Sequence, residues 1–263
     1  MNQSTHPHES VNSCGSLYQL IRIKSDTHKI LSMEQEYIKI GNKDCRVYIV
    51  GQPTVLLIQP MDEDELKSID QEIAMIAEKS GSMFAMAVFN IEDWEKELMP
   101  WPDRAVSSNA EVGHHATDTL SYIEQCLLPW LRHRLGNLPC LLGGYSLSAL
   151  FALWASTQVD SFVGIAASSP SVWIKGWIDF ARENPTKAQH IYLSLGDKEE
   201  HVKNKVFAQV GNNIRQYHDM LTAQLGDAHI TLVWNVGNHF QNSTERTANG
   251  FVWCLGRMEK EIK

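Results

Sequence analysis

Residues 140–154 read Cys-Leu-Leu-Gly-Gly-Tyr-Ser-Leu-Ser-Ala-Leu-Phe-Ala-Leu-Trp, with one serine set between small residues, after a short apolar run and before a helical pattern. This order predicts a sharp turn from strand to helix that holds the hydroxyl of Ser146 at the carboxyl edge of a sheet. Gly144 and Ser148 stand two residues to either side, where strand and helix approach too closely for larger side chains. The stretch therefore predicts a nucleophile elbow, with serine at 148 where glycine is usual.

Apolar runs on both sides of the elbow predict the rest of the sheet. Buried strands are expected at 54–58, 83–89, 140–143, 162–167, 190–195 and 230–235, and helices at 63–79, 118–135, 149–156, 202–225 and 246–258. Earlier strands are expected at 18–23, 36–40 and 45–50, the last two joined by a turn at 41–44. The alternation from residue 54 onward implies parallel strands with right-handed crossovers. The predicted fold class is α/β, a mostly parallel central sheet with an antiparallel N-terminal hairpin and helices on both faces.

The size and charge of the chain limit its organisation and its partners. A chain of 263 residues, 43% of them hydrophobic, can form one domain, expected at 17–263 after a disordered or loosely held terminus at 1–16. The net charge of -8 argues against nucleic acid as a partner. Neither a secretory signal nor a run of roughly 20 apolar residues is visible, so we expect no membrane partner and a cytoplasmic location. A homo-oligomer is left open.

The cysteines and histidines do not indicate a cofactor or a metal. Five scattered cysteines, odd in number and without a C-x-x-C pair, suit reduced thiols better than a disulfide or zinc framework. His114 and His115 are adjacent, so their side chains are expected to point apart. We expect neither a bound metal nor a cofactor.

A serine hydroxyl becomes a useful nucleophile only when a base removes its proton, so Ser146 needs a histidine partner. Of eleven histidines, only His239 directly follows the predicted last strand. It lies in Gly237-Asn-His-Phe240, where glycine and asparagine allow a tight turn back over the elbow. His239 is therefore the predicted base.

An acidic side chain is also needed, to hold the imidazole in the right tautomer. The loop after the strand at 190–195 offers Asp197, Glu199 and Glu200. Glu199 is the preferred candidate, because Asp197 lies too near the strand end to reach the histidine comfortably. Asp197 and Glu200 remain alternatives.

Two N–H donors must face the charge that develops on an attacked carbonyl oxygen. Leu147, directly after the serine, is expected to supply one of them. The second is expected from the loop after the strand at 54–58, which reads Gln59-Pro60-Met61-Asp62. Pro60 has no N–H, so Met61 is the candidate, with Gln59 behind it.

Several large side chains near these loops are candidates for binding a small-molecule substrate. They are Trp101, Arg104, Tyr145, Trp173 and Phe240. Loops at the carboxyl edge of a parallel sheet commonly line a ligand cleft. The aromatic residues could equally well be packed against the protein, and the sequence leaves both interpretations open.

Four motifs in order together resemble the esterase branch of the α/β hydrolases that includes enterochelin esterase-like enzymes and esterase D. They lie at 143–154, 167–173, 195–199 and 237–240, and the likeness extends over roughly residues 45–255. The resemblance implies an α/β-hydrolase fold and cleavage of a carboxylic ester or thioester. It also implies that Ser146, Glu199 and His239 act as nucleophile, acid and base.

The sequence departs from the family pattern at two places. Ser148 and Ala149 replace the usual pair of glycines in the elbow, and Gln59-Pro60 replaces the familiar His-Gly or Asp-Gly after the third strand. The second departure affects the expected oxyanion donor. Two alternatives to an esterase therefore stay open, an acyltransferase of the same fold and a hydrolase-fold binding protein without turnover.

Overall fold

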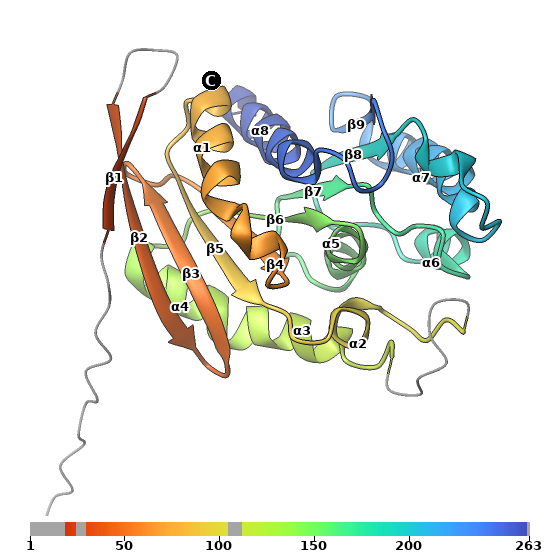
Figure 1. Ribbon diagram of the computed structural model, residues 1–263, viewed down its shortest axis with the longest axis horizontal. Coiled ribbons are helices and arrows are strands. Elements are labelled where there is room, and N and C mark those ends of the chain that lie inside the picture. Colours follow the sequence, from red (N-terminus) through yellow and green to blue (C-terminus); the bar gives the residue numbers. More distant parts are fainter. Residues whose placement is uncertain (1–18, 25–29, 105–111, 262–263) are drawn as a thin grey trace, which may run out of the picture.

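The apolar runs around the elbow form adjacent strands of one sheet in the computed structural model, which describes residues 19–24, 30–104 and 112–261 (Figure 1). The predicted loose terminus at 1–16 lies outside these residues. Side chains are described for residues 32–104 and 112–258.

The described residues contribute nine strands to this sheet, in the order β1-β2-β3-β5-β4-β6-β7-β8-β9. They are β1 (Gln19–Lys24), β2 (Ile30–Ile40), β3 (Lys43–Val50), β4 (Leu56–Met61), β5 (Phe84–Asn90), β6 (Cys140–Tyr145), β7 (Gly164–Ser168), β8 (His190–Gly196) and β9 (Ile230–Asn235). β1, β2 and β3 pair antiparallel, and β3 pairs antiparallel with β5. β5, β4 and β6 to β9 are mutually parallel. The predicted α/β class and the antiparallel start are confirmed.

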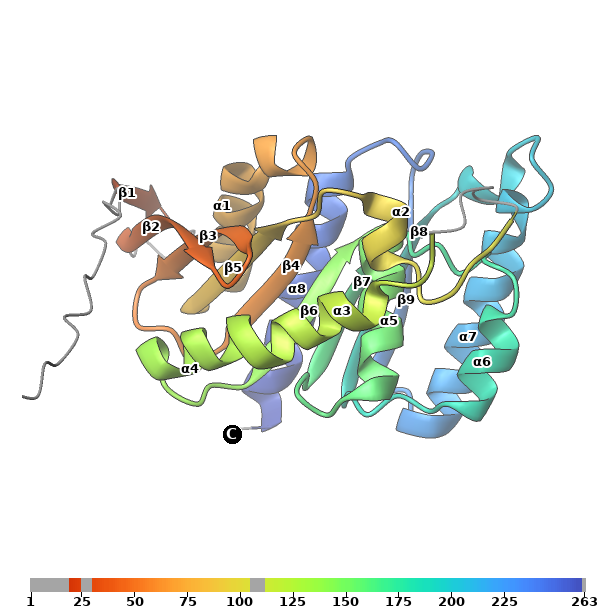
Figure 2. The ribbon, with the colours of Figure 1, turned by 90° about the horizontal axis from the view of Figure 1, so that it is seen from below.

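The helices cover both faces of the sheet, as the alternating pattern predicts. They are α1 (Ile69–Ser80), α2 (Trp94–Leu98), α3 (Ala116–Tyr122), α4 (Leu128–Leu135), α5 (Leu147–Gln158), α6 (Trp177–Glu183), α7 (Val210–Leu225) and α8 (Ser243–Glu261). Figure 1 shows α1 and α8 side by side above the sheet and α3, α4 and α5 below it, and Figure 2 shows the same layers from below.

Alternate residues of the central strands supply the two hydrophobic cores. In β4, Leu56 and Ile58 point into the core between the sheet and α3 to α7. Leu57 and Met61 point into the core on the opposite face, between the sheet and α1 and α8. This follows from the two-residue period of a strand. Because both faces are covered, β4 to β8 are buried along nearly their whole length.

β4 is longer than predicted, and this correction matters for the site. The strand continues to Met61, so residues 59–61 do not form the predicted loop. Pro60 is tolerated because pairing between β4 and β6 ends at Ile58, and no ladder bond is lost where its N–H is missing.

The predicted helix at 202–225 is wrong in its first third, since α7 begins only at Val210. The side chain of Asn204 accepts a hydrogen bond from the N–H of Val206, which favours a turn over a helix. The short 3-10 turn η4 (Phe207–Gln209) lies in this region instead, and another, η3 (Glu199–His201), directly precedes it.

The predicted helix at 118–135 is confirmed as α3 and α4, joined by the π-turn η2 (Ile123–Leu127) before Pro129.

Candidate active site

The turn between β6 and α5 holds Ser146 in a conformation that few residues adopt. Its φ is 60° and its ψ is -118°, outside the helical and extended regions. A side chain at Gly144 could not be accommodated, because an added Cβ would lie 2.0 Å from Oγ of Ser148. Strand and helix are therefore in close contact on both sides of the serine, and its hydroxyl lies at the carboxyl edge of the sheet.

Three side chains from distant parts of the chain meet at this edge. Nε2 of His239 lies 3.0 Å from Oγ of Ser146, and Nδ1 of the same ring lies 2.7 Å from Oε2 of Glu199. With the proton on Nδ1, the ring donates to the carboxylate and accepts from the serine hydroxyl. The structure thus brings together the three residues that the sequence indicates, in hydrogen-bonded order.

The two alternative carboxylates have other partners. Oδ1 of Asp197 accepts from the N–H of Gly237 at 2.8 Å, which fastens the turn that carries His239. Both carboxylate oxygens of Glu200 accept from the guanidinium of Arg215, each at 2.7 Å. Glu199 is therefore the carboxylate of this loop that contacts the histidine.

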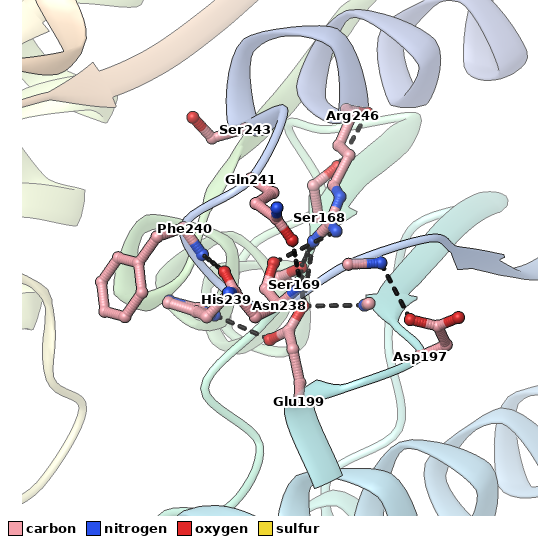
Figure 3. A network of polar contacts seen from close by, with 12 residues as sticks. Ser168, Ser169, Asp197, Glu199, Asn238, His239, Phe240, Gln241, Ser243 and Arg246 are labelled. Atoms are coloured by element: carbon pink, nitrogen blue, oxygen red, sulfur yellow. Dashed lines mark hydrogen bonds and ion pairs between the residues drawn. The ribbon is translucent and has the colours of Figure 1, made fainter. Parts of the chain in front are cut away.

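The second oxygen of Glu199 is held as firmly as the first (Figure 3). Oε1 accepts from Oγ of Ser169 at 2.7 Å, from the N–H of Gly196 at 2.7 Å and from Nη1 of Arg246 at 3.0 Å. Burial alone would raise the pKa of Glu199, but the bonds from His239, Ser169 and Gly196 outweigh it and lower the pKa below its ordinary value. The buried carboxyl is thus held in its charged form.

Arg246 is the member of this network that the sequence did not single out. Its side chain is buried and also donates to the hydroxyl of Tyr145 at 3.0 Å and to the carbonyl of Asn238 at 3.2 Å. It lies in the first turn of α8, where the helix dipole disfavours a cation. An arginine in the first turn of a helix was the one sequence signal for this residue. The buried carboxylate of Glu199 beside it explains that position.

The structure separates the two predicted oxyanion donors. Leu147 is the first residue of α5, so its N–H has no acceptor within the helix, and none is present among the described residues. Met61 is different: the carbonyl of Pro60 in the same peptide unit accepts from Oγ of Ser148 at 2.9 Å. Because the C=O and N–H of a trans peptide point in opposite directions, the Met61 N–H points away from α5. The prediction of Met61 as a donor toward Ser146 is therefore wrong.

The next peptide unit has the opposite orientation. The carbonyl of Met61 accepts from the N–H of Ile91 on the β5 side at 2.8 Å, so the N–H of Asp62 points toward the side of β6 and α5. Gln59 has the same parity in the strand as Met61, so its N–H also faces β5. Of these residues, Asp62 is therefore the one whose N–H points toward β6 and α5.

A mostly apolar cavity of about 180 Å³ opens beside Ser146. Two of the predicted substrate-binding residues, Trp173 and Phe240, line it together with Val202, Phe207 and Val210. The rings of Trp173 and Phe207 are 4.6 Å apart and form one wall. Sequence reasoning missed Phe207 and Val202 because it placed them inside a helix.

The other predicted substrate-binding residues do not line this cavity. The Trp101 ring packs against Trp177 and Phe180, and its Nε1 donates to the carbonyl of Lys175 at 2.9 Å. Arg104 is exposed. The hydroxyl of Tyr145 donates to the carbonyl of His239 at 2.7 Å, so Tyr145 supports the turn that carries the histidine.

Within the described part of the chain, no three His, Cys, Asp or Glu side chains are grouped so that they could hold a metal ion. None of the helices in that part is both long and apolar enough to cross a membrane.

Solved structures with the same fold are dissimilar in sequence. An IroE-like serine hydrolase from Shewanella oneidensis has a TM-score of 0.66 at 13% identity, covering 91% of this chain and 80% of its own. The siderophore hydrolase EstA from Aspergillus nidulans has a TM-score of 0.57 at 15% identity, covering 96% and 99%. A cold-adapted esterase from an Arctic intertidal metagenomic library has a TM-score of 0.55 at 13% identity, covering 86% and 94%. These similarities confirm an α/β-hydrolase fold.

No curated protein matches the sequence. A family model does match, over residues 67–238, and its description is "Putative esterase". That range includes Ser146, Glu199 and the turn before His239, and it exceeds half of the chain. The chain therefore belongs to this esterase family of α/β hydrolases.

Proposed function

We propose that the protein is a serine esterase that cleaves a carboxylic ester through an acyl-enzyme on Ser146. The observation that carries the proposal is the hydrogen-bonded series from Ser146 through His239 to Glu199. Family membership supports ester hydrolysis, and the geometry supplies the residues for it. Serine, histidine and a carboxylate in this order are the arrangement that activates a hydroxyl.

His239 carries the proton in each step of the proposed reaction. Nε2 of His239 takes the proton of Ser146 while Oγ bonds to the carbonyl carbon of the ester. The tetrahedral intermediate then expels the alcohol, which receives that proton from His239. A water molecule then attacks the acyl-enzyme and gives its proton to the same imidazole. The second tetrahedral intermediate releases the carboxylic acid as Oγ of Ser146 takes that proton back from His239. Glu199 stays ionised throughout and stabilises the imidazolium.

The negative oxygen of the tetrahedral intermediate requires donors that are already in position. We assign the N–H of Leu147 as one donor, because it is the free first N–H of α5. We assign the N–H of Asp62 as the second, in place of Met61, because it points to the side of the strand where α5 begins. In the structure this N–H interacts with the carboxyl of Glu65, and the oxyanion must displace that contact. The Gln59-Pro60 departure from the family pattern therefore does not remove the second donor.

The cavity indicates the size and polarity of the group beside the scissile bond. At about 180 Å³ it is small for a ligand site, since drug-sized pockets measure roughly 300–1,000 Å³. Its walls at Trp173, Phe207 and Val210 are aromatic or aliphatic. We propose that it takes a small apolar acyl or alcohol group, and that an oxygen ester and a thioester are both accepted.

A fluorophosphonate probe and hydrolysis of p-nitrophenyl acetate test the proposal. The wild type should be labelled and active. Ser146→Ala should lose labelling, and His239→Ala should lose about 10³-fold or more in kcat, because neither residue acts without the other. The melting temperature of His239→Ala should stay close to that of the wild type, since the ring is partly exposed.

Ser171→Ala is the matched control, because Oγ of Ser171 lies 3.4 Å from Oγ of Ser146 without its own contact to the imidazole. It should retain labelling. Equal labelling of the wild type and Ser146→Ala would exclude Ser146 as the nucleophile. An unlabelled and inactive wild type would favour the binding protein without turnover, and ester products formed with added alcohols would favour an acyltransferase.

We also propose a cytoplasmic location, which is supported by the free thiols of the four described cysteines, Cys45, Cys126, Cys140 and Cys254.

A further inference from the structure

A second cavity, of about 210 Å³, lies between the end of β4, the start of α1 and the start of α8. It is separate from the apolar cavity: Tyr145 lines it, whereas the neighbouring Ser146 lines the other. Nine of its ten lining residues carry a side-chain oxygen, and none is lysine, arginine or histidine. The chemistry of this cavity is therefore that of an oxygen-donor site.

Three oxygens at this cavity have no hydrogen-bond donor among the described residues. They are Oε1 of Gln59, Oε2 of Glu65 and Oε1 of Glu72. Gln59 is 1% exposed and Glu72 is 2% exposed, so solvent does not satisfy these atoms. A buried polar group without a partner destabilises the folded state, and a buried charge without a partner does so more strongly. An orphaned amide oxygen beside two orphaned carboxylate oxygens is a set that a bound cation would satisfy.

Charges nearby do not neutralise the two glutamates. Lys67 pairs with Asp64 at the exposed rim, and Arg46 donates to the carbonyl of Leu66. The N-terminus of α8 contributes a partial charge of about +0.5, which is small against two carboxylates.

We propose that this cavity binds one divalent cation of the calcium type, through the carboxylates of Glu65 and Glu72 and the amide oxygen of Gln59. Calcium prefers six to eight oxygen ligands and accepts carboxylates, amide carbonyls and water in irregular geometry. The hydroxyl of Ser68, which lies 3.1 Å from that of Thr244, offers a further oxygen at the wall. A cation there would join β4, the turn before α1 and α1 itself, in a cavity that Tyr145 also lines.

Calcium titration of the EDTA-treated, dialysed full-length chain tests the proposal by isothermal calorimetry and thermal unfolding. The wild type should bind one Ca²⁺ per chain and melt at a higher temperature when Ca²⁺ is present. Glu65→Gln and Glu72→Gln should each weaken Ca²⁺ at least tenfold, and the double variant should bind none. Because glutamine has the shape of glutamate, the double variant in EDTA should melt no lower than the wild type.

Glu63→Gln is the matched control, since this exposed carboxylate lies on the same segment but does not line the cavity. It should bind Ca²⁺ like the wild type. An equal rise in melting temperature with Na⁺ at the same ionic strength would overturn the proposal, because it would reduce the effect to charge screening. Absence of saturable Ca²⁺ binding, or unchanged binding in the double variant, would also overturn it and leave two carboxyls that hold protons. These readouts do not involve ester hydrolysis, so they are independent of the proposed esterase activity.

Discussion

Arg246 determines what Glu199 can do, because it occupies the carboxylate oxygen that His239 does not use. Nη1 of Arg246 bonds Oε1 of Glu199 while His239 bonds Oε2, so the carboxylate cannot rotate without breaking a charged bond. Both partners of the ion pair are nearly inaccessible to solvent. Removing one partner of such a pair typically costs about 3–5 kcal/mol, because the other charge is left buried. Glu199 is thus held rigidly as the acceptor for the imidazole.

Neighbouring glutamates allow a direct test of which carboxylate serves the histidine. Glu199→Gln should reduce kcat for p-nitrophenyl acetate by roughly 10³–10⁴-fold, because an amide no longer fixes the imidazole tautomer or stabilises its charge. Glu200→Gln should stay within about twofold of the wild type, because Glu200 pairs with Arg215 and does not contact the imidazole. The measurement is kcat and KM of both variants beside the wild type.

Fluorophosphonate labelling separates this effect from loss of folding, since a folded Glu199→Gln should still be labelled, but slowly. A greater loss in Glu200→Gln than in Glu199→Gln would show that the acid has been assigned to the wrong residue.

The contact between β6 and α5 depends on two small residues that oppose each other. Oγ of Ser148 lies where a Cβ on Gly144 would be, and the same oxygen donates to the carbonyl of Pro60 at the end of β4. Serine at 148 therefore adds a tie between α5 and β4 that glycine could not make. The departure from the family elbow is an additional contact between two elements.

A double-mutant cycle measures this contact. Gly144→Ala should destabilise the protein by about 3 kcal/mol or more, because backbone and side chain of Ser148 both block the new methyl. Ser148→Gly should cost about 1–2 kcal/mol, through the lost bond to Pro60 and the glycine in a helix. The double variant should lose less unfolding free energy than the sum of the two single losses, because Oγ of Ser148 no longer blocks the methyl at position 144. Thermal unfolding followed by circular dichroism provides the three values, and simple additivity would contradict the proposed contact.

The elements that could be predicted from sequence are those with a strong local pattern. The parallel strands and α5 follow from buried apolar runs, and the position of His239 follows from its turn residues. The end of β4 was misjudged because proline normally interrupts a strand, and the missing pairing partner beyond Ile58 is visible only in three dimensions. Arg246 was missed because its partner Glu199 is 47 residues away. Local patterns therefore locate elements, whereas buried ion pairs and peptide orientations depend on the assembled sheet.

At the scale of the whole molecule, the polar network of the site connects the ends of separate elements. Ser169 follows β7, Glu199 follows β8 and Arg246 lies in α8 (Figure 3). Tyr145, which ends β6, also bonds Arg246. These segments meet at the carboxyl edge of the sheet. Ionised Glu199 thus contributes to global stability as well as to the proposed chemistry.

This contribution should depend on pH in a predictable direction. The pKa of Glu199 is lower in the folded protein than its ordinary value of 4.5, so the folded state binds the proton less tightly than the unfolded state. The stabilisation is therefore fully present above pH 4.5 and is lost as the pH falls through the folded pKa. Urea unfolding at pH 7 should show Glu199→Gln to be less stable than the wild type by about 3–5 kcal/mol, since Arg246 is left unpaired. The difference should shrink steadily below pH 4.5, where the wild-type carboxyl takes up a proton and also leaves Arg246 without a charged partner. A gap between the two proteins that stays constant from pH 7 down through the acid transition would show that Glu199 does not carry this charge in the folded state.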